Sequence, residues 1–256
     1  MSALPSAEDE ARRLIRAATD RGVVLRLVGG VAVAVRCPSA TVGGLRRTYA
    51  DIDLVGHVKQ SRAIADLLTE MGYRPRTRFN AMNGSKRLVF NDLVNRRRVD
   101  VFLDVFEMSH RFDFSTRLGM HPLTLPLADL LATKLQVHEI TEKDLKDLAA
   151  LLVDHDLGGG EADTIDAHHL ARMSGRDWGV YRTFKANLST LGEAMAGFGL
   201  TPSQLAVAKD RIGRLAGMIE AEPKTLGWRV RARVGSRVPW YEVPEADESV
   251  VVDSFD

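Results

Sequence analysis

The chain has 256 residues, of which 45% are hydrophobic and 27% are charged, and this composition is typical of a globular protein with a sizeable core. The formal net charge is only +1, so the molecule as a whole is not built to bind polyelectrolytes. Cys37 is the single cysteine, which excludes an intrachain disulfide and favours a reducing compartment.

The N-terminus gives no sign of export. It carries Glu8, Asp9 and Glu10, whereas a signal peptide begins with basic residues and continues with an apolar run. No apolar run in the sequence approaches the ~20 residues that a membrane helix needs. We therefore expect a cytoplasmic protein with no membrane partner.

The first half of the chain alternates helical and strand-like segments. In chain order we expect a helix (7–20), a strand ending at two glycines (23–28), a short helix (31–35), a loop (37–48), a strand (50–55) and a helix closed by Gly72 (59–72). Residues 86–91 and 97–106 are strand-like with Asn95 in the turn between them, which predicts an antiparallel hairpin.

The second half is predicted to be helical, with segments at 127–139, 142–153, 164–173, 178–197 and 203–220. Gly158, Gly159 and Gly160 interrupt the pattern, and residues 242–256 hold six acidic residues and no basic one. We expect a fold of the α/β (α+β) class, with a short mixed sheet flanked by helices and a helical C-terminal part. The expected divisions are 1–157, 161–240 and an acidic tail at 241–256.

Two carboxylates mark the second strand. Side chains alternate along a strand, so Asp51 and Asp53 share one face while Ile52 points into the core. Two carboxylates that close repel each other unless a cation lies between them, and hard oxygen ligands suit Mg²⁺. The alternative is a strand end with two solvated carboxylates.

Gly29 and Gly30 follow the first buried strand and precede a helix. Free backbone N–H groups at a helix N-terminus bind phosphate, and glycine lets the phosphate approach the backbone closely. The alternative is a tight turn that needs positive φ.

A third apolar strand carries Asp100 and Asp104. A carboxylate there is costly unless it is paired or bound to a metal. The two residues are four apart and are expected to share a face, so either one is a candidate partner for Asp51 and Asp53. The simpler reading is that the basic residues 96–98 pair with these acids.

Together these motifs resemble the nucleotidyltransferase superfamily of the polymerase-beta type. The matching segments are Val28-Gly29-Gly30, Asp51-Ile52-Asp53 and Val99-Asp100-Val101, in the family's order. The resemblance implies Mg²⁺ held by Asp51, Asp53 and Asp100, an NTP cradled at Gly29 and Gly30, and transfer of a nucleoside monophosphate to a hydroxyl. The sequence departs from the family pattern in the long gap of twenty residues before Asp51, and in having Gly30 where serine is frequent.

A further resemblance, to the AbiEii-type branch, extends to about residue 153. It rests on Ala132-Thr133-Lys134-Leu135 and on the segment 143–148, and it implies that Lys134 reaches the triphosphate. Asp147 is then expected to orient Lys134 or the nucleotide. The alternatives are a lysine that snorkels to water and a surface pair between Asp147 and Lys143. That branch includes toxins that act on tRNA, so the resemblance also implies an RNA acceptor and an antitoxin protein as partner.

Other features are weaker. His168 and His169 have no metal-ligand spacing around them, so a structural role is expected. Basic residues gather in 74–98 and 224–237, which suits a polyanion or a solvated surface. The leading hypothesis is a metal-dependent nucleotidyltransferase whose acceptor is tRNA or another RNA. The alternatives are a small-molecule acceptor of the antibiotic type, and a catalytically silent nucleotide- or RNA-binding module on the same fold.

Overall fold

The structure is a computed structural model that describes residues 3–159 and 163–243. Its largest sheet has the strand order β1-β2-β5-β4-β3, in which β2 and β5 are parallel and the other neighbours are antiparallel. These strands are β1 (Leu25–Val28), β2 (Asp51–Gly56), β3 (Arg74–Pro75), β4 (Arg87–Asp92) and β5 (Arg97–Leu103). The expected fold class, a short mixed sheet flanked by helices, is confirmed, and so is the hairpin of β4 and β5.

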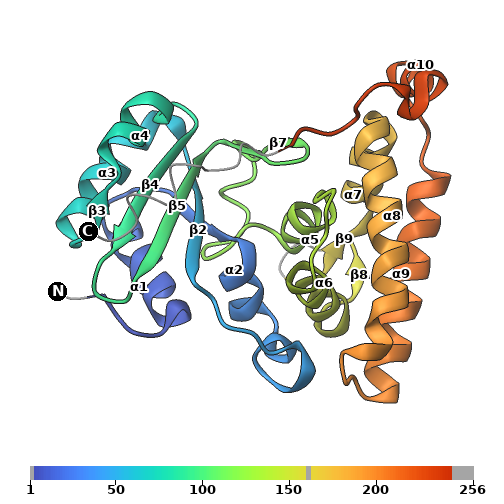
Figure 1. The fold of residues 1–256 in the computed structure, drawn as a ribbon, viewed down its shortest axis with the longest axis horizontal. Coiled ribbons are helices and arrows are strands. Elements are labelled where there is room, and N and C mark those ends of the chain that lie inside the picture. The colour runs from blue at the N-terminus through green and yellow to red at the C-terminus, as the bar shows by residue number, and fades with distance from the viewer. Residues whose placement is uncertain (1–2, 160–162, 244–256) are drawn as a thin grey trace.

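Helices α1 (Ala7–Asp20), α2 (Gly29–Arg36), α3 (Ser61–Glu70) and α4 (Thr77–Asn83) surround the sheet (Figure 1). On β2, Ile52 and Leu54 are fully buried, and Gly56 on the same face lies against Ile64 of α3. The alternation predicted for this strand is therefore confirmed. Asp51 and Asp53 point to the opposite face, away from α3.

The rest of the described chain is mainly helical. Helices α5 (Leu127–Leu135) and α6 (Glu142–Asp154) lie between the sheet and the helices α7 (Ala167–Arg176), α8 (Trp178–Ala194) and α9 (Pro202–Ala221), as Figure 1 shows. The capping boxes of Thr141 with Asp144 and of Thr201 with Gln204 start α6 and α9. In the part of the chain that the structure describes, no helix is both long enough and apolar enough to cross a membrane.

Several elements differ from the sequence expectations. Helices α4 and α10 (Leu226–Val234) were not predicted, because neither buries a residue and so neither shows an apolar stripe. Helix α5 ends at Leu135 rather than at 139. The expected strand 97–106 breaks at Asp104, whose φ is +58°, and continues as β6 (Val105–Glu107), which pairs with β7 (Arg111–Asp113).

The predicted glycine break is partly structured. Gly158 belongs to β8 (Leu157–Gly158), which pairs with β9 (Ile165–Asp166), whereas Gly160 lies outside the described residues. Residues 244–256, which make up most of the predicted acidic tail, also lie outside them. The division into parts at 157–161 stays a prediction.

Candidate active site

The strand-to-helix turn at Gly29 has the positive φ that the tight-turn alternative requires, and its helix begins two residues before the predicted one. Val28 ends β1 with an extended backbone, and Gly29 opens α2 with a φ of +72°. No side chain caps the helix, so its first N–H groups have no side-chain acceptor within the described residues. The Asp53 carboxylate lies where a Cβ at position 29 would be, so only glycine fits beside it.

Asp51 and Asp53 form an unpartnered carboxylate pair. Both are half-buried, and within the described chain neither one makes a side-chain hydrogen bond or ion pair. Burial, together with the neighbouring charges of Asp51 and Asp100, raises the pKa of Asp53 to about 7. The three acids therefore interact, and the charges of Lys134 and Arg98 offset part of this effect on Asp53 without a direct ion pair to it among the described residues.

Asp100 lies directly beside Asp53, because the two residues are partners in the parallel register of β2 and β5. It is fully buried between two guanidinium groups. Arg87 donates to Oδ1 at 2.6 and 2.9 Å, and Arg98 forms an ion pair with Oδ2 at 2.6 Å. The expectation that basic residues pair with these acids is confirmed at Arg98.

Arg98 interacts electrostatically with all three acids, Asp51, Asp53 and Asp100. Burial by itself would lower the pKa of its guanidinium, but the charges of Asp100, Asp51 and Asp53 raise that pKa above its ordinary value. Its side chain is therefore a cation placed among the candidate metal-binding carboxylates.

Lys134 approaches the same cluster from α5. Its Nζ lies 2.9 Å from Asp147 Oδ2 and 3.0 Å from Asp144 Oδ1, and its side chain is only 13% exposed. Burial would lower the pKa of Lys134, yet Asp147 and Asp144 raise it above its usual range. The same lysine acts on Asp53, whose pKa it lowers. Lys134 is thus charged and paired, which excludes the reading of a lysine that merely reaches water.

Asp147 is buried and connects Lys134 to a residue that the sequence did not single out. Arg47 donates to both of its oxygens, at 2.9 and 2.7 Å. The Arg47 guanidinium lies 4.4 Å from the ring centroid of Tyr49 and occupies the space that a side chain at Gly30 would need. A surface pair of Asp147 with Lys143 is therefore excluded. Arg47 was missed because it lies in an irregular loop, where no periodicity marks a buried side chain.

The structure thus brings Gly29, Asp53 and Asp100 together, with Asp51 on the same face of β2 and Lys134 close enough to affect Asp53. It does not bring Asp104 there. Asp104 lies beyond the end of β5, where its Oδ1 is 2.8 Å from His57 Nδ1 and its Oδ2 accepts from the Val58 N–H at 3.2 Å. The predicted common face with Asp100 is wrong, because the backbone turns at Asp104.

The donor set fits a magnesium ion only in part. Across residues 3–159 and 163–243, no group of three or more His, Cys, Asp or Glu side chains is arranged to hold a metal. Magnesium, however, commonly takes one or two carboxylates together with waters and substrate phosphates. Asp51 and Asp53 fit such an ion. Asp100 adds no third ligand in this arrangement, because both of its oxygens are paired with arginines.

The chain was compared with known proteins. No protein-family model matches it, and a search of curated proteins finds no match. Among solved structures it is similar to the lincosamide antibiotic adenylyltransferase LnuA in its lincomycin-bound crystal structure, with 14% identity and a TM-score of 0.40, over 58% of this chain and 98% of that one. At that level of similarity nothing follows for the chemistry of this chain, so its function is inferred from its own side chains.

Proposed function

We propose that this protein is a metal-dependent nucleotidyltransferase that moves a nucleoside monophosphate from an NTP to an acceptor hydroxyl. One observation carries the proposal: the unpartnered carboxylates of Asp51 and Asp53 lie beside the uncapped N-terminus of α2, with Asp53 against Gly29. A site for a divalent cation and a site for phosphate are therefore adjacent, as transfer from a metal–NTP complex requires.

The triphosphate is held at the turn of Gly29 and Gly30. Backbone N–H groups at the start of a helix, together with the helix dipole, favour bound anions. Lys134 and Arg98 add fixed positive charge near Asp53. These cations offset the charge that develops on the leaving pyrophosphate, as electrostatic stabilisation of a transition state requires.

Asp51 and Asp53 would hold the magnesium ion. When bound, this ion neutralises phosphate charge and orients the triphosphate. Its arrival also offsets the repulsion between the two carboxylates, which adds to burial in raising the pKa of Asp53.

The transfer itself is a displacement at the α-phosphorus. The acceptor oxygen forms a bond to that phosphorus while the bond to the pyrophosphate oxygen breaks, and the hydroxyl proton passes to a carboxylate. Asp100 is our candidate for that carboxylate, or for a third metal ligand. In either role one of its oxygens must exchange an arginine partner, since Arg87 and Arg98 hold both.

The acceptor belongs to one of two classes. An RNA acceptor, such as a tRNA end, together with an antitoxin partner, corresponds to the AbiEii-type resemblance. A small-molecule acceptor is the alternative. The rival hypothesis from another class is a catalytically silent binding module. Against it, Asp51 and Asp53 have no side-chain partner among the described residues, and a silent site has no need to keep two carboxylates that repel each other.

The test uses the purified chain with each of four α-³²P-labelled NTPs, MgCl₂, and either total RNA or a small-molecule library. We expect label to reach an acceptor and pyrophosphate to be released in equal amount. Asp51→Asn and Asp53→Asn should abolish both signals. Binding of Mn²⁺, followed by electron paramagnetic resonance without NTP, should weaken in the same variants. Label transfer that persists in both variants would refute the proposal.

A further inference from the structure

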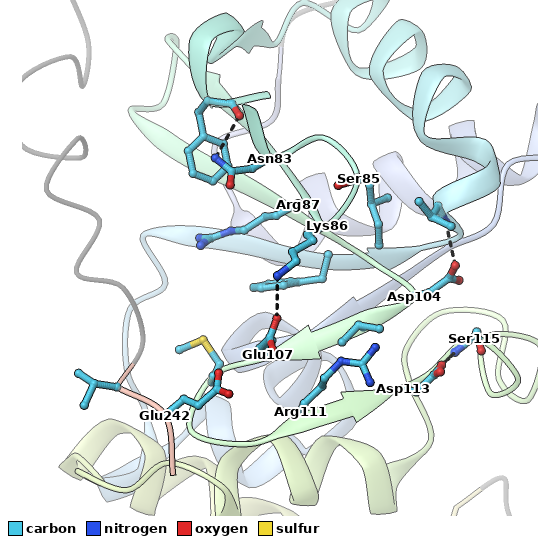
Figure 2. Close-up of a pocket in the computed structure, with 17 residues that line it drawn as sticks. Asn83, Ser85, Lys86, Arg87, Asp104, Glu107, Arg111, Asp113, Ser115 and Glu242 are labelled. Atoms are coloured by element: carbon cyan, nitrogen blue, oxygen red, sulfur yellow. Dashed lines mark hydrogen bonds and ion pairs between the residues drawn. The ribbon is translucent and has the colours of Figure 1, made fainter. Parts of the chain in front are cut away.

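A cavity of about 680 Å³ opens beside the candidate active site. It lies between α4, the end of β5, the β6–β7 hairpin and residues 242–243 (Figure 2). This volume is in the range of small-molecule sites, and its walls combine apolar side chains with several charged ones. None of the residues so far assigned to NTP or metal lines it.

The cavity and the carboxylate cluster share one face of the sheet. Phe102 lines the cavity and lies two residues after Asp100 on β5, so both side chains point the same way. Arg87 lies opposite Phe102 on β4, and its guanidinium is 5.1 Å from the Phe102 ring centroid while it donates to Asp100. The Arg87 side chain therefore lies between the cavity and the carboxylate of Asp100.

The charges in the cavity favour a cation. Three basic and four acidic side chains line it. Arg87 shares the charge of Asp100 with Arg98, and Lys86 pairs with Glu107 at 3.5 Å, which Figure 2 shows. Of the remaining lining charges among the described residues, Asp104 is held by His57 and the Val58 N–H, and Arg111 is the one positive group against Asp113 and Glu242.

The pairing of basic side chains with acids also argues against a polyanion as the ligand of this cavity. Among the described residues, acids pair with several basic side chains of 74–98, including Lys86, Arg87, Arg97 and Arg98. A phosphate backbone would meet a cavity with a surplus of carboxylates, and like charges repel. The rings of Phe79 and Phe102, with the Arg87 guanidinium 5.8 and 5.1 Å from their centroids, instead offer a surface on which a small ring can stack.

We infer that this cavity binds the acceptor, and that the acceptor is a small hydroxylated amine with an apolar ring rather than the end of an RNA. The acceptor role rests on the proposed nucleotidyl transfer. The ammonium group lies on the β6–β7 side of the cavity, where Asp113 and Glu242 stand at opposite ends of the hairpin in Figure 2 and each is a candidate partner. The ring lies on Phe79 and Phe102, and the hydroxyl is directed past Arg87 to Asp100.

Binding is tested first, without catalysis. Tyramine and tyrosol are matched probes, because they share a phenol ring and differ in an amine against a hydroxyl at the end of the side chain. By calorimetry or saturation-transfer NMR, tyramine should bind at least about tenfold more tightly, which is the effect of roughly one charged contact. The double variant Asp113→Asn/Glu242→Gln should lose that preference. Glu193→Gln, an exposed acid on α8, is the matched control and should keep it.

Both substitutions in the double variant are at exposed positions, so its thermal midpoint should stay near that of the wild type. Equal binding of the two probes, or tyramine binding that is unchanged in the double variant, overturns the inference.

Label transfer from α-³²P-NTPs then separates the two claims. Transfer to tyramine that the double variant weakens supports both. Transfer to RNA alone, unchanged in the double variant, upholds nucleotidyl transfer and overturns the acceptor inference. If no acceptor is labelled while tyramine binding still depends on Asp113 and Glu242, the cation-binding cavity stands and the proposed function fails.

Discussion

Lys134 and Asp147 join helices α5 and α6 through an ion pair of 2.9 Å that is almost fully enclosed by protein. Asp147 also accepts two hydrogen bonds from Arg47, which lies against Gly30. The helices that follow the sheet are thus connected by charge to the turn that we assign to the triphosphate. A change at Lys134 should therefore affect both stability and NTP binding.

We expect Lys134→Met to lower the free energy of unfolding by about 1–3 kcal/mol, because Asp144 and Asp147 lose a buried cationic partner. If the lysine also reaches the phosphates, kcat/KM should fall roughly ten- to hundredfold. Urea unfolding and steady-state transfer measure the two effects. Lys143→Met, an exposed lysine on α6, is the control and should change neither. Unaltered stability and activity in Lys134→Met would remove this residue from the site.

The raised pKa of Asp53 predicts a stability that falls as pH rises. In the folded protein this carboxyl keeps its proton up to a pH of about 7, whereas the unfolded chain loses it near the ordinary value of 3.8. Between these values the folded state binds more protons, so ionisation costs stability on the order of 1 kcal/mol per pH unit, and the loss ends above pH 7. The side chain of Asp53→Asn cannot ionise. The free energy of unfolding of this variant, relative to that of the wild type, should therefore rise between pH 4 and 7.

The measurement is urea unfolding of both proteins in EDTA across pH 4.5–8. Added Mg²⁺ at pH 8 should reduce the difference in unfolding free energy between Asp53→Asn and the wild type, because the cation stabilises only the wild-type carboxylate pair. Two stability curves that stay parallel over the whole range would show that Asp53 has an ordinary pKa.

Asp100 and Asp104 are expected to differ sharply in activity. Asp100→Asn should slow single-turnover transfer by about a hundredfold or more, the usual effect of losing a group that handles the transferred proton. Asp104→Asn should leave the rate near that of the wild type, since its carboxylate contacts His57 and the Val58 backbone instead. NTP affinity, measured without acceptor, should change less in Asp100→Asn than in Asp51→Asn. A slower Asp104→Asn would mean that the third carboxylate is misassigned.

Gly29→Ala and Gly43→Ala separate backbone strain from site geometry. Both glycines have a left-handed φ, +72° and +57°, so each alanine should cost about 1–2 kcal/mol. At Gly43 the new methyl group has no atom within 4 Å, whereas at Gly29 it collides with the Asp53 carboxylate. Only Gly29→Ala should lose Mn²⁺ binding and transfer activity. Equal losses in the two variants would show that Gly29 serves the turn alone.

Much of the site could be predicted from local patterns. Period-2 alternation placed Asp51 and Asp53 on one face, and a buried strand ending in glycines placed a helix at 31–35, which the structure begins two residues earlier, at Gly29. The partners of these residues could not be predicted. Arg47 and Asp147 are 100 residues apart, and nothing in the sequence around either one marks the other. Arg98 was expected to pair with an acid, but its position among all three depends on the register of β2 and β5.

The helices and strands were likewise predictable where the signal is local in the sequence. Helix α1 has the predicted bounds because a cap and an apolar stripe define it locally. Helices α4 and α10 bury nothing and so gave no stripe to recognise. The turn at Asp104 was missed because positive φ in a non-glycine residue depends on tertiary contacts, here those with His57 and Val58.

The parallel pairing of β2 with β5 also dictates when this site can form during synthesis. Asp53 meets Asp100 only after 47 more residues have left the ribosome, and Arg47 meets Asp147 only after 100. Such long-range closures fold slowly, and until they form, a nascent chain has carboxylates without their cations. Translation therefore has to pass α6 before Asp53 and Arg47 have both of these partners, so fragments released earlier lack the assembled side-chain cluster.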